Sequence, residues 1–194
     1  MILVFDTETT GFFQEKLPVD HPSQPHIVQL AAQLCDLTGK ELMGFSVIVS
    51  PGDVSIPPQA SAVHGITDDV AKDLGVTTEL AMKLFTHLYA KADTIVAHNM
   101  KFDKGVMEAF IAREHKKIMP FRKAVFCTME AASPLVNLPP TERMLAAGFT
   151  KPKPPKLEEC IKHFFNEDMI GAHDAMADVA ACKRVYFHML ARQS

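Results

Sequence analysis

Four carboxylates and one histidine lie in three short clusters that are far apart in the sequence, and each cluster adjoins a predicted strand or helix. The clusters are Asp6-Thr7-Glu8, Asp103 within the segment HNMKFD, and His173 with Asp178 within HDAMAD. Close carboxylates repel one another unless a cation lies between them. In α/β proteins, side chains from several elements gather outside the carboxyl ends of parallel strands. The clusters therefore favour an α/β fold that brings them into one site.

Five segments have strand patterns. Residues 1–5 form a continuous apolar run, typical of a central strand buried on both faces. Residues 27–35 alternate with a period of two, which predicts a half-buried strand, and a turn leads into a third strand at 42–49. These three would form an antiparallel meander. Two further strands are expected at 94–97 and 124–127. In this half of the chain strands alternate with helices, which indicates parallel strands joined by helical crossovers. We expect a mixed five-stranded sheet flanked by helices.

Three helices have clear signals. Thr78 is a candidate N-cap for a helix whose apolar face comprises Leu80, Ala81, Leu84, Phe85 and Leu88. Asn99 is a candidate cap for a helix that runs to about His115. A last helix over 174–190 has an apolar face and many alanines, which would let it lie close against the sheet.

The composition bounds the class of protein. With 194 residues we expect a single domain over 1–194. No apolar run reaches the ~18–20 residues that cross a membrane, and the first residues lack the basic start of a signal peptide. The four cysteines show no CxxC spacing, so we expect reduced thiols in a cytoplasmic protein. The net charge of −3 disfavours tight, nonspecific binding to duplex nucleic acid.

The first cluster has the strongest local signal. Asp6 and Glu8 would leave the same face of a strand if the extended backbone continues to Glu8. A pair of carboxylates at a loop edge is the alternative interpretation, because Asp-x-Glu alone is common. The fully apolar strand before it and the Thr-Thr-Gly after it favour a ligand site, with Gly11 permitting a tight turn and close approach of a ligand.

The other two clusters are ambiguous when each is taken alone. Asp103 in a first helical turn is more often a favourable charge near the helix N-terminus than a ligand. His173 and Asp178 near a helix start are usually structural. Together with the first cluster, the carboxylates predict two Mg²⁺ or Mn²⁺ ions. His173 fits a general base better than a metal ligand, because histidine is mostly neutral at pH 7–8.

Taken together, these motifs resemble the DEDDh branch of the DnaQ-like 3′→5′ exonucleases, the family of the proofreading ε subunit of bacterial DNA polymerase III. The matching segments are FDTETTG from residue 5, HGIT from 64, HNMKFD from 98 and HDAMAD from 173. The resemblance implies a ribonuclease H-like sheet. It implies that Asp6, Glu8 and Asp178 bind one metal, that Asp6 and Asp103 bind a second, and that His173 is the base.

The same resemblance implies a set of residues that contact the 3′-terminal nucleotide. They are Thr9, Gly11, Phe12, His64, His98, Asn99 and Phe102. Phe12 and Phe102 would stack on or between bases. Core packing is an equal alternative for Phe102, and His64 is equally explained as a turn residue before Gly65. Position 12 holds Phe where the family often has a smaller aliphatic residue, so this base contact is expected to differ.

The expected function is metal-dependent hydrolysis of single-stranded DNA from its 3′ end, with release of 5′-mononucleotides. Its partners would be DNA or RNA 3′ ends, and no polymerase or repair partner is identifiable. The chain stops soon after the last helix, so we expect a standalone enzyme. An RNA-directed exonuclease of the same family is the nearest alternative. A non-catalytic nucleic-acid-binding module is the alternative of another class, and it predicts the loss of a carboxylate or of the histidine.

The segment Lys151–Lys156 alternates lysines with prolines that hold it extended. A solvated connecting loop is the simpler interpretation. The alternative is that Lys151, Lys153 and Lys156 contact phosphates upstream of the scissile bond.

Overall fold

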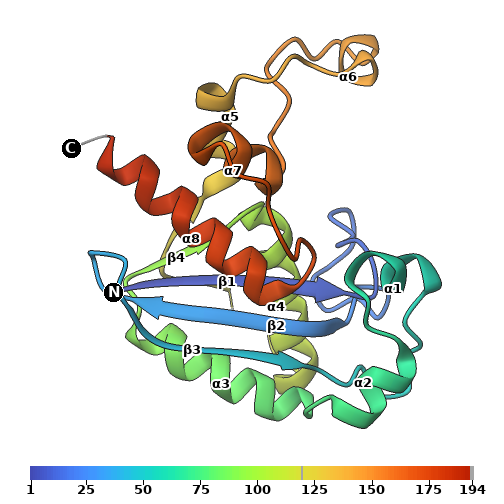
Figure 1. Cartoon of the computed structure of the whole chain (residues 1–194). Coiled ribbons are helices and arrows are strands. Elements are labelled where there is room, and N and C mark those ends of the chain that lie inside the picture. Colours follow the sequence, from blue (N-terminus) through green and yellow to red (C-terminus); the bar gives the residue numbers. More distant parts are fainter. Residues whose placement is uncertain (119, 193–194) are drawn as a thin grey trace.

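The computed structural model describes residues 1–118 and 120–192. Its centre is a five-stranded sheet in the order β3-β2-β1-β4-β5 (Figure 1). The strands are β1 (Ile2–Thr9), β2 (Ile27–Cys35), β3 (Glu41–Ile48), β4 (Thr94–Ala97) and β5 (Ala124–Cys127). β1, β2 and β3 pair antiparallel, whereas β4 is parallel to β1 and β5 is parallel to β4. This confirms the predicted mixed sheet and its meander.

Helices cover both faces of the sheet (Figure 1). They are α1 (Pro58–His64), α2 (Asp68–Leu74), α3 (Thr78–Lys91), α4 (Met100–His115), α5 (Thr128–Val136), α6 (Glu142–Ala146), α7 (Leu157–Phe165) and α8 (Ala175–Ala191). The three long helices α3, α4 and α8 are those predicted from the sequence. The other five have five to nine residues each, too few to show a repeated helical period.

The central strand β1 separates two apolar clusters. Leu3 and Phe5 pack with residues of α3 and α4, whereas Ile2 and Val4 pack with residues of α7 and α8. Side chains of a strand alternate between its faces, which is why consecutive residues enter different clusters. Full burial of a side chain of this size stabilises the fold by about 1.5–3 kcal/mol. The strand that carries the first acidic cluster is therefore firmly held on both faces.

The prediction that β2 is half-buried is wrong, because all nine of its residues are buried. Its polar residues face α8 instead of solvent. Gln29 Nε2 donates to Asp174 Oδ2 at 2.9 Å, and Lys183 Nζ donates to Gln33 Oε1 at 2.8 Å. The alternating glutamines of β2 therefore bind the helix that covers this face of the sheet, and they are not exposed to water.

Two helix starts also differ from the predictions. Thr77 caps α3 by accepting from Leu80 N, so Thr78 is the first helical residue. Leu80 is 45% exposed and lies outside the apolar face, where Met82 is buried instead. Asn99 occupies the predicted N-cap of α4 but is left-handed, with φ 74°, and its side chain makes no capping bond.

All four cysteines are free thiols, as predicted. No helix within the described ranges is long and apolar enough to cross a membrane. The segment 151–156 is a loop between α6 and α7, also as predicted. A single domain over 1–194 stays a prediction.

Candidate active site

The first cluster lies inside β1, because the strand continues past residue 5 to Thr9. Asp6 and Glu8 are half-buried on the face covered by α8, and the alternating residues Thr7 and Thr9 are buried on the other face. The condition for both carboxylates to share one face is therefore met. Gly11 differs from expectation, since its φ is not in the left-handed region and an added Cβ would meet no atom within 4 Å.

Asp103 joins the cluster from the first turn of α4. It is buried, and Thr7 holds one of its oxygens with two donors. Thr7 Oγ1 donates to Asp103 Oδ1 at 2.8 Å, and Thr7 N donates to the same oxygen at 3.2 Å. These two bonds fix the orientation of the Asp103 carboxyl group beside β1. The other oxygen, Oδ2, takes part in neither of them. The sequence analysis missed this role of Thr7, although its position between Asp6 and Glu8 was a signal.

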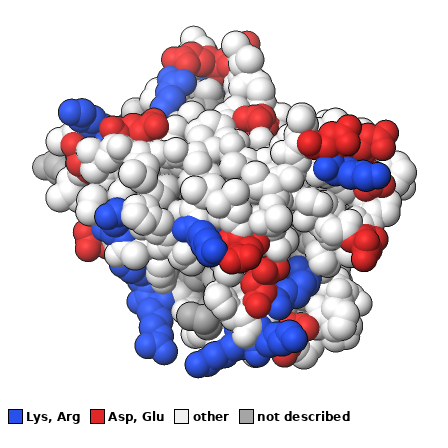
Figure 2. Space-filling model, turned by 90° about the horizontal axis from the view of Figure 1, so that it is seen from below, with Lys and Arg blue, Asp and Glu red and all other residues white. Residues whose placement is uncertain are grey.

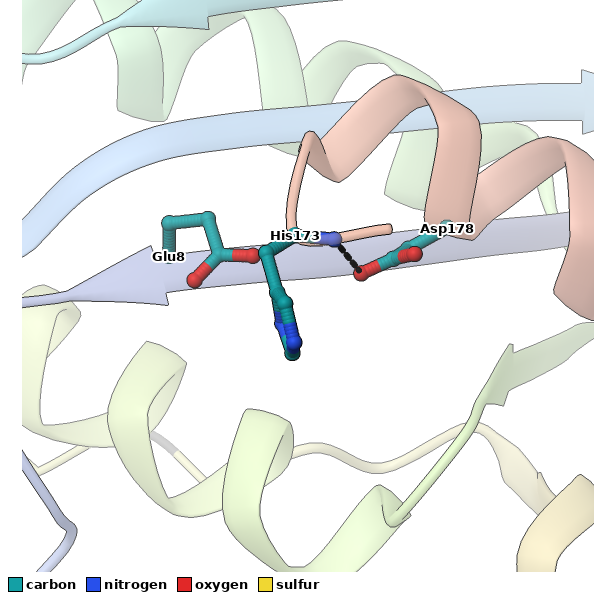
Figure 3. A group of neighbouring side chains, drawn as sticks. All are labelled: Glu8, His173 and Asp178. Carbon is teal, nitrogen blue, oxygen red and sulfur yellow. Dashed lines mark hydrogen bonds between the residues drawn. The ribbon is translucent and has the colours of Figure 1, made fainter. Parts of the chain in front are cut away.

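His173 and Asp178 reach the cluster from the start of α8. One ligand atom each from Glu8, His173 and Asp178 lie within 4.8 Å of one another. Figure 3 shows the carboxylates of Glu8 and Asp178 on either side of His173, and the backbone N of His173 donates to Asp178 Oδ2 at 3.3 Å. His173 is exposed and has a left-handed φ of 68°. This backbone is strained for a non-glycine residue and presents the ring to solvent.

The four carboxyl groups of the cluster have raised pKa values and no basic side chain that compensates their charge. Burial and the neighbouring Asp103 and Asp178 raise the pKa of Asp6 well above its ordinary value. Burial is also the largest cause for the others, and it raises the pKa of Glu8 to about 8, of Asp103 to about 7 and of Asp178 to about 6. Within the described residues, no lysine or arginine forms an ion pair with any of the four.

This donor set fits divalent cations. Carboxylate oxygens are the ligands that Mg²⁺ and Mn²⁺ prefer, and a bound cation would offset both the burial of these charges and their mutual repulsion. Asp6, Glu8 and Asp178 lie on the α8 side, while Asp103 approaches from α4. The geometry also leaves the ring of His173 close enough to share a cation with Glu8 and Asp178. Its role as a base rather than a ligand stays a prediction.

A further pair of residues positions the α8 start. Asp174 caps the helix by accepting from Met176 N and Ala177 N. Gln29 binds both the capping residue and the first residue of the helix. Its Nε2 donates to Asp174 Oδ2 at 2.9 Å, and its Oε1 accepts from Ala175 N at 3.1 Å. Gln29 is also the β2 partner of Glu8 in the sheet register. One buried amide therefore ties the α8 start to the strand pair that carries Glu8.

The predicted nucleotide-contact residues beside β1 and at the start of α4 differ in how exposed they are and in the contacts they already make. Phe12 is 84% exposed, so its ring is free to stack on a base. Thr9 is buried, and its hydroxyl donates to Gly11 O at 2.6 Å. Phe102 is half-buried and packs against the apolar cluster of α3 and α4, which supports the core-packing alternative. Asn99 is half-buried at the entry to α4.

The two histidines of this set are in opposite situations. His64 Nδ1 accepts from Ile66 N at 3.1 Å, so the neutral ring carries its proton on Nε2, and that buried atom has no partner of good geometry. Burial lowers the pKa of His64, and a hydrogen bond with the Thr9 backbone opposes this, so a ligand oxygen would compete with that backbone for the ring. His98 has both ring nitrogens engaged, at 2.9 Å from Thr128 Oγ1 and 3.0 Å from Pro155 O. A nucleotide contact through either atom of His98 would have to break one of these bonds.

The lysine segment is only partly available to phosphates. Lys153 is half-buried and its Nζ contacts both oxygens of Glu159 at 2.6 and 2.8 Å. Lys156 Nζ lies 3.2 Å from Glu158 Oε1. Lys151 is exposed and forms no ion pair within the described ranges. Lys151 is therefore the member of the three that is best placed for a phosphate contact.

A ribonuclease H-like sheet with clustered carboxylates beside its central strand defines the class of nuclease-type hydrolases. Within this class, the chain matches the Exonuclease family (RNase_T) over residues 3–186. The chain therefore belongs to this exonuclease family, which confirms the resemblance to DnaQ-like DEDDh enzymes.

Relatives of known name agree with this membership. The DNA polymerase III subunit epsilon of Buchnera aphidicola from Acyrthosiphon pisum is 28% identical over 196 residues, covering 98% of this chain and 73% of that protein. The Escherichia coli K12 subunit is 32% identical over 108 residues, covering 55% of this chain and 41% of that protein. A DNA polymerase III subunit epsilon-like protein of Rhodobacter capsulatus is 36% identical over 103 residues, covering 52% of this chain and 13% of that protein.

Solved structures confirm the fold. E. coli Exonuclease I in complex with a dT13 oligonucleotide superposes with a TM-score of 0.77 at 21% identity, covering 99% of this chain and 41% of that one. The product-bound structure of exonuclease I gives a TM-score of 0.76 at 20% identity, covering 99% of this chain and 43% of that one. The chain thus spans less than half the length of these exonuclease chains.

Proposed function

We propose that this chain is a divalent-metal-dependent 3′→5′ exonuclease that removes 5′-mononucleotides from single-stranded DNA. The observation that carries the proposal is the convergence of Asp6, Glu8, Asp103 and Asp178, from three elements, into one cluster with raised pKa values and no cationic partner in the described structure. Such a cluster opposes folding unless a cation compensates its charge, and strongly shifted pKa values are typical of functional sites. The names of the relatives and the oligonucleotide bound to Exonuclease I support DNA as substrate.

In this proposal the residues divide the work. Asp6, Glu8 and Asp178 hold one cation, and Asp103 with Asp6 holds a second. When bound, the cations orient water and neutralise charge that develops on the scissile phosphate. The exposed His173 takes the proton from the attacking water, and its ring is held near Glu8 and Asp178 for this purpose. Phe12 stacks on the terminal base, and His64 Nε2 donates to a nucleotide oxygen.

The test is release of nucleotides from a labelled single-stranded oligonucleotide, with Mg²⁺ and with excess EDTA. We expect mononucleotides to leave the 3′ end only with Mg²⁺, and a 3′-phosphorylated strand to be a poor substrate. Asp178→Asn, folded but inactive, is the matched control. Undiminished hydrolysis in EDTA, or efficient cutting of a circular strand, would refute the proposal. RNA of the same sequence, assayed alongside, decides between DNA-directed and RNA-directed activity.

A further inference from the structure

Residues 138–153, which we call the arm, leave the body of the molecule between α5 and α7. The arm closes on itself at its base, where Lys153 N donates to Leu138 O at 3.1 Å. Its outer end is α6, which is capped by Thr141 and has no buried residue. Figure 1 shows α6 standing away from the sheet and the other helices. The arm is thus a small folded projection rather than part of the core.

The base of the arm is tied to the segment that carries Asp103. His98 Nε2 lies 3.0 Å from Pro155 O, which can only accept, so the bond is N–H···O=C. The other nitrogen then accepts from the Thr128 hydroxyl at 2.9 Å. Burial lowers the pKa of His98 to about 4, in agreement with this neutral form. His98 directly follows β4 and precedes α4, so this bond fixes the arm relative to the carboxylate cluster.

Two further features stiffen this base. The ion pair between Lys153 and Glu159 is half-buried, and Glu159 also accepts from Lys156 N at 2.7 Å. Prolines at 139, 140, 152, 154 and 155 restrict the backbone on both sides of the arm. A rigid projection loses little conformational entropy when it binds, which favours a role in recognition.

The outer surface of the arm combines an aromatic ring with positive charge. Phe149 is 64% exposed, and Lys151 lies exposed two residues further on. Arg143 on α6 is also exposed, and neither cation forms an ion pair in the described part of the chain. An aromatic platform flanked by cations is the composition that binds single-stranded nucleic acid. In a chain of net charge −3, this positive projection is complementary to a polyanion.

The other basic region is less suited to this role. Figure 2 shows Lys and Arg gathered along the lower edge of the face seen from below, interspersed with Asp and Glu. A surface hollow of about 570 Å³ is lined by Lys117, Arg122 and Lys123 together with Tyr89. Lys123 Nζ is already bound to the carbonyls of Ala90 and Ala92 at the end of α3. This lysine therefore stabilises the fold rather than offering a free cation.

We propose that the arm binds the single strand upstream of its 3′ end, with Phe149 stacking on a base and Lys151 and Arg143 contacting phosphates. The proposal rests on the proposed function for the identity of the strand. It commits to nucleic acid rather than to a protein partner, because Arg143 and Lys151 precede and follow Phe149 in the arm as exposed cations without ion pairs in the described residues, although Leu145 of the same arm is also 52% exposed.

The experiment compares fluorescently labelled dT4 with dT20, because only the longer strand has many nucleotides upstream of its 3′ end. Affinities are measured in EDTA by anisotropy, and KM is measured with Mg²⁺. Phe149→Ala should weaken dT20 about tenfold, which is within the range for loss of one stacked base, and leave dT4 unchanged. Phe149→Trp should bind as wild type, and Phe149→Leu should bind as the alanine variant. Leu37→Ala is the control, because Leu37 is 76% exposed at the β2–β3 turn.

The charge contribution is tested by salt dependence. Lys151→Ala should lower the slope of log affinity against log salt for dT20 by about 0.7, the value for one phosphate on a single strand. Lys40→Ala, another exposed lysine at the β2–β3 turn, should leave it unchanged. The proposal is overturned if Phe149→Ala matches Leu37→Ala on dT20. It is also overturned if Phe149→Leu retains full affinity, which would indicate an apolar docking surface. Lack of hydrolysis of both dT4 and dT20 by the wild type with Mg²⁺ would reject the proposed function separately.

Discussion

At the scale of single residues, the most informative one is Thr7, which separates Asp6 from Glu8 in the sequence but lies on the opposite face of β1. Its hydroxyl and backbone N both donate to Asp103 Oδ1. Hydrogen bonds to a carboxylate favour its charged form and fix its orientation. Thr7 is thus a positioning residue that acts through Asp103.

We predict that Thr7→Val reduces turnover by about tenfold or more, since valine has the same shape but no donor. It should also weaken Mn²⁺ binding at one of two sites, measured by calorimetry without substrate. Thr7→Ser keeps the hydroxyl and should restore both properties. Wild-type metal stoichiometry and affinity in the valine variant would show that the bond has no positioning role.

His173 is the residue whose role the geometry leaves open between base and ligand. If it is the base, His173→Ala should lower the rate by about 10²–10⁴-fold, the usual loss for a general base. Mn²⁺ affinity should then stay close to that of the wild type, because the carboxylates remain in place. A variant that no longer binds Mn²⁺ would instead identify His173 as a ligand.

At the scale of elements, the catalytic arrangement depends on how α8 sits on the sheet. The buried Gln29 binds both Asp174 Oδ2 and Ala175 N, which sets the position of the helix start that carries His173 and Asp178. Gln33, four residues further along β2 and on the same face, binds Lys183 and Met176 of the same helix instead. The two glutamines offer a matched comparison within one strand.

We predict that Gln29→Leu costs about 1–3 kcal/mol in the free energy of unfolding, because it leaves the buried Ala175 N–H without a partner. Gln33→Leu should cost less, because Lys183 is half-buried and keeps Glu41 as an ion-pair partner. Only Gln29→Leu should also reduce kcat, by about tenfold or more, since it releases the α8 start. Urea unfolding and steady-state kinetics separate the two effects. Equal kcat in the two variants would mean that α8 is held by other contacts.

At the scale of the whole molecule, the carboxylate cluster should oppose folding when no metal is present. The folded-state pKa values of Glu8, Asp103 and Asp178 are raised to about 8, 7 and 6, and that of Asp6 is raised as well. Between about pH 4 and pH 8 the folded state therefore binds more protons than the unfolded chain. The slope of stability with pH contributed by these groups is negative, so the cluster lowers stability as the pH rises through this window.

We predict that Asp6→Asn is more stable than the wild type at pH 8 in EDTA, by on the order of 1–3 kcal/mol, because the amide removes one buried carboxylate and its repulsion of Asp103, Asp178 and Glu8. The difference should shrink as the pH falls toward about 3–4, where the wild-type carboxyls become protonated in the unfolded chain as well as in the folded one. Millimolar Mg²⁺ should stabilise only the wild type, by mass action. Urea unfolding at several pH values measures this, and a difference independent of pH and Mg²⁺ would contradict it.

Local sequence patterns predict the strands, the long helices and the five residues of the carboxylate–histidine cluster. Each of these rests on local pattern. A run of five apolar residues, a period of two, and an acidic residue beside a helix cap are all defined by near neighbours along the chain. The three clusters could be assigned to one site because the carboxyl ends of parallel strands lie at the same edge of a sheet, independently of the conformation of the connecting loops.

The tertiary structure alone decided which partners these residues meet. Whether β2 faces water or α8, whether Thr7 reaches Asp103, and whether His98 binds a nucleotide or Pro155 depend on groups 57 to 146 residues away. The five short helices were also unpredicted, because so few residues carry no measurable period and form only when packed. Local pattern thus specifies which side chains lie at the site, and long-range packing specifies how each is held.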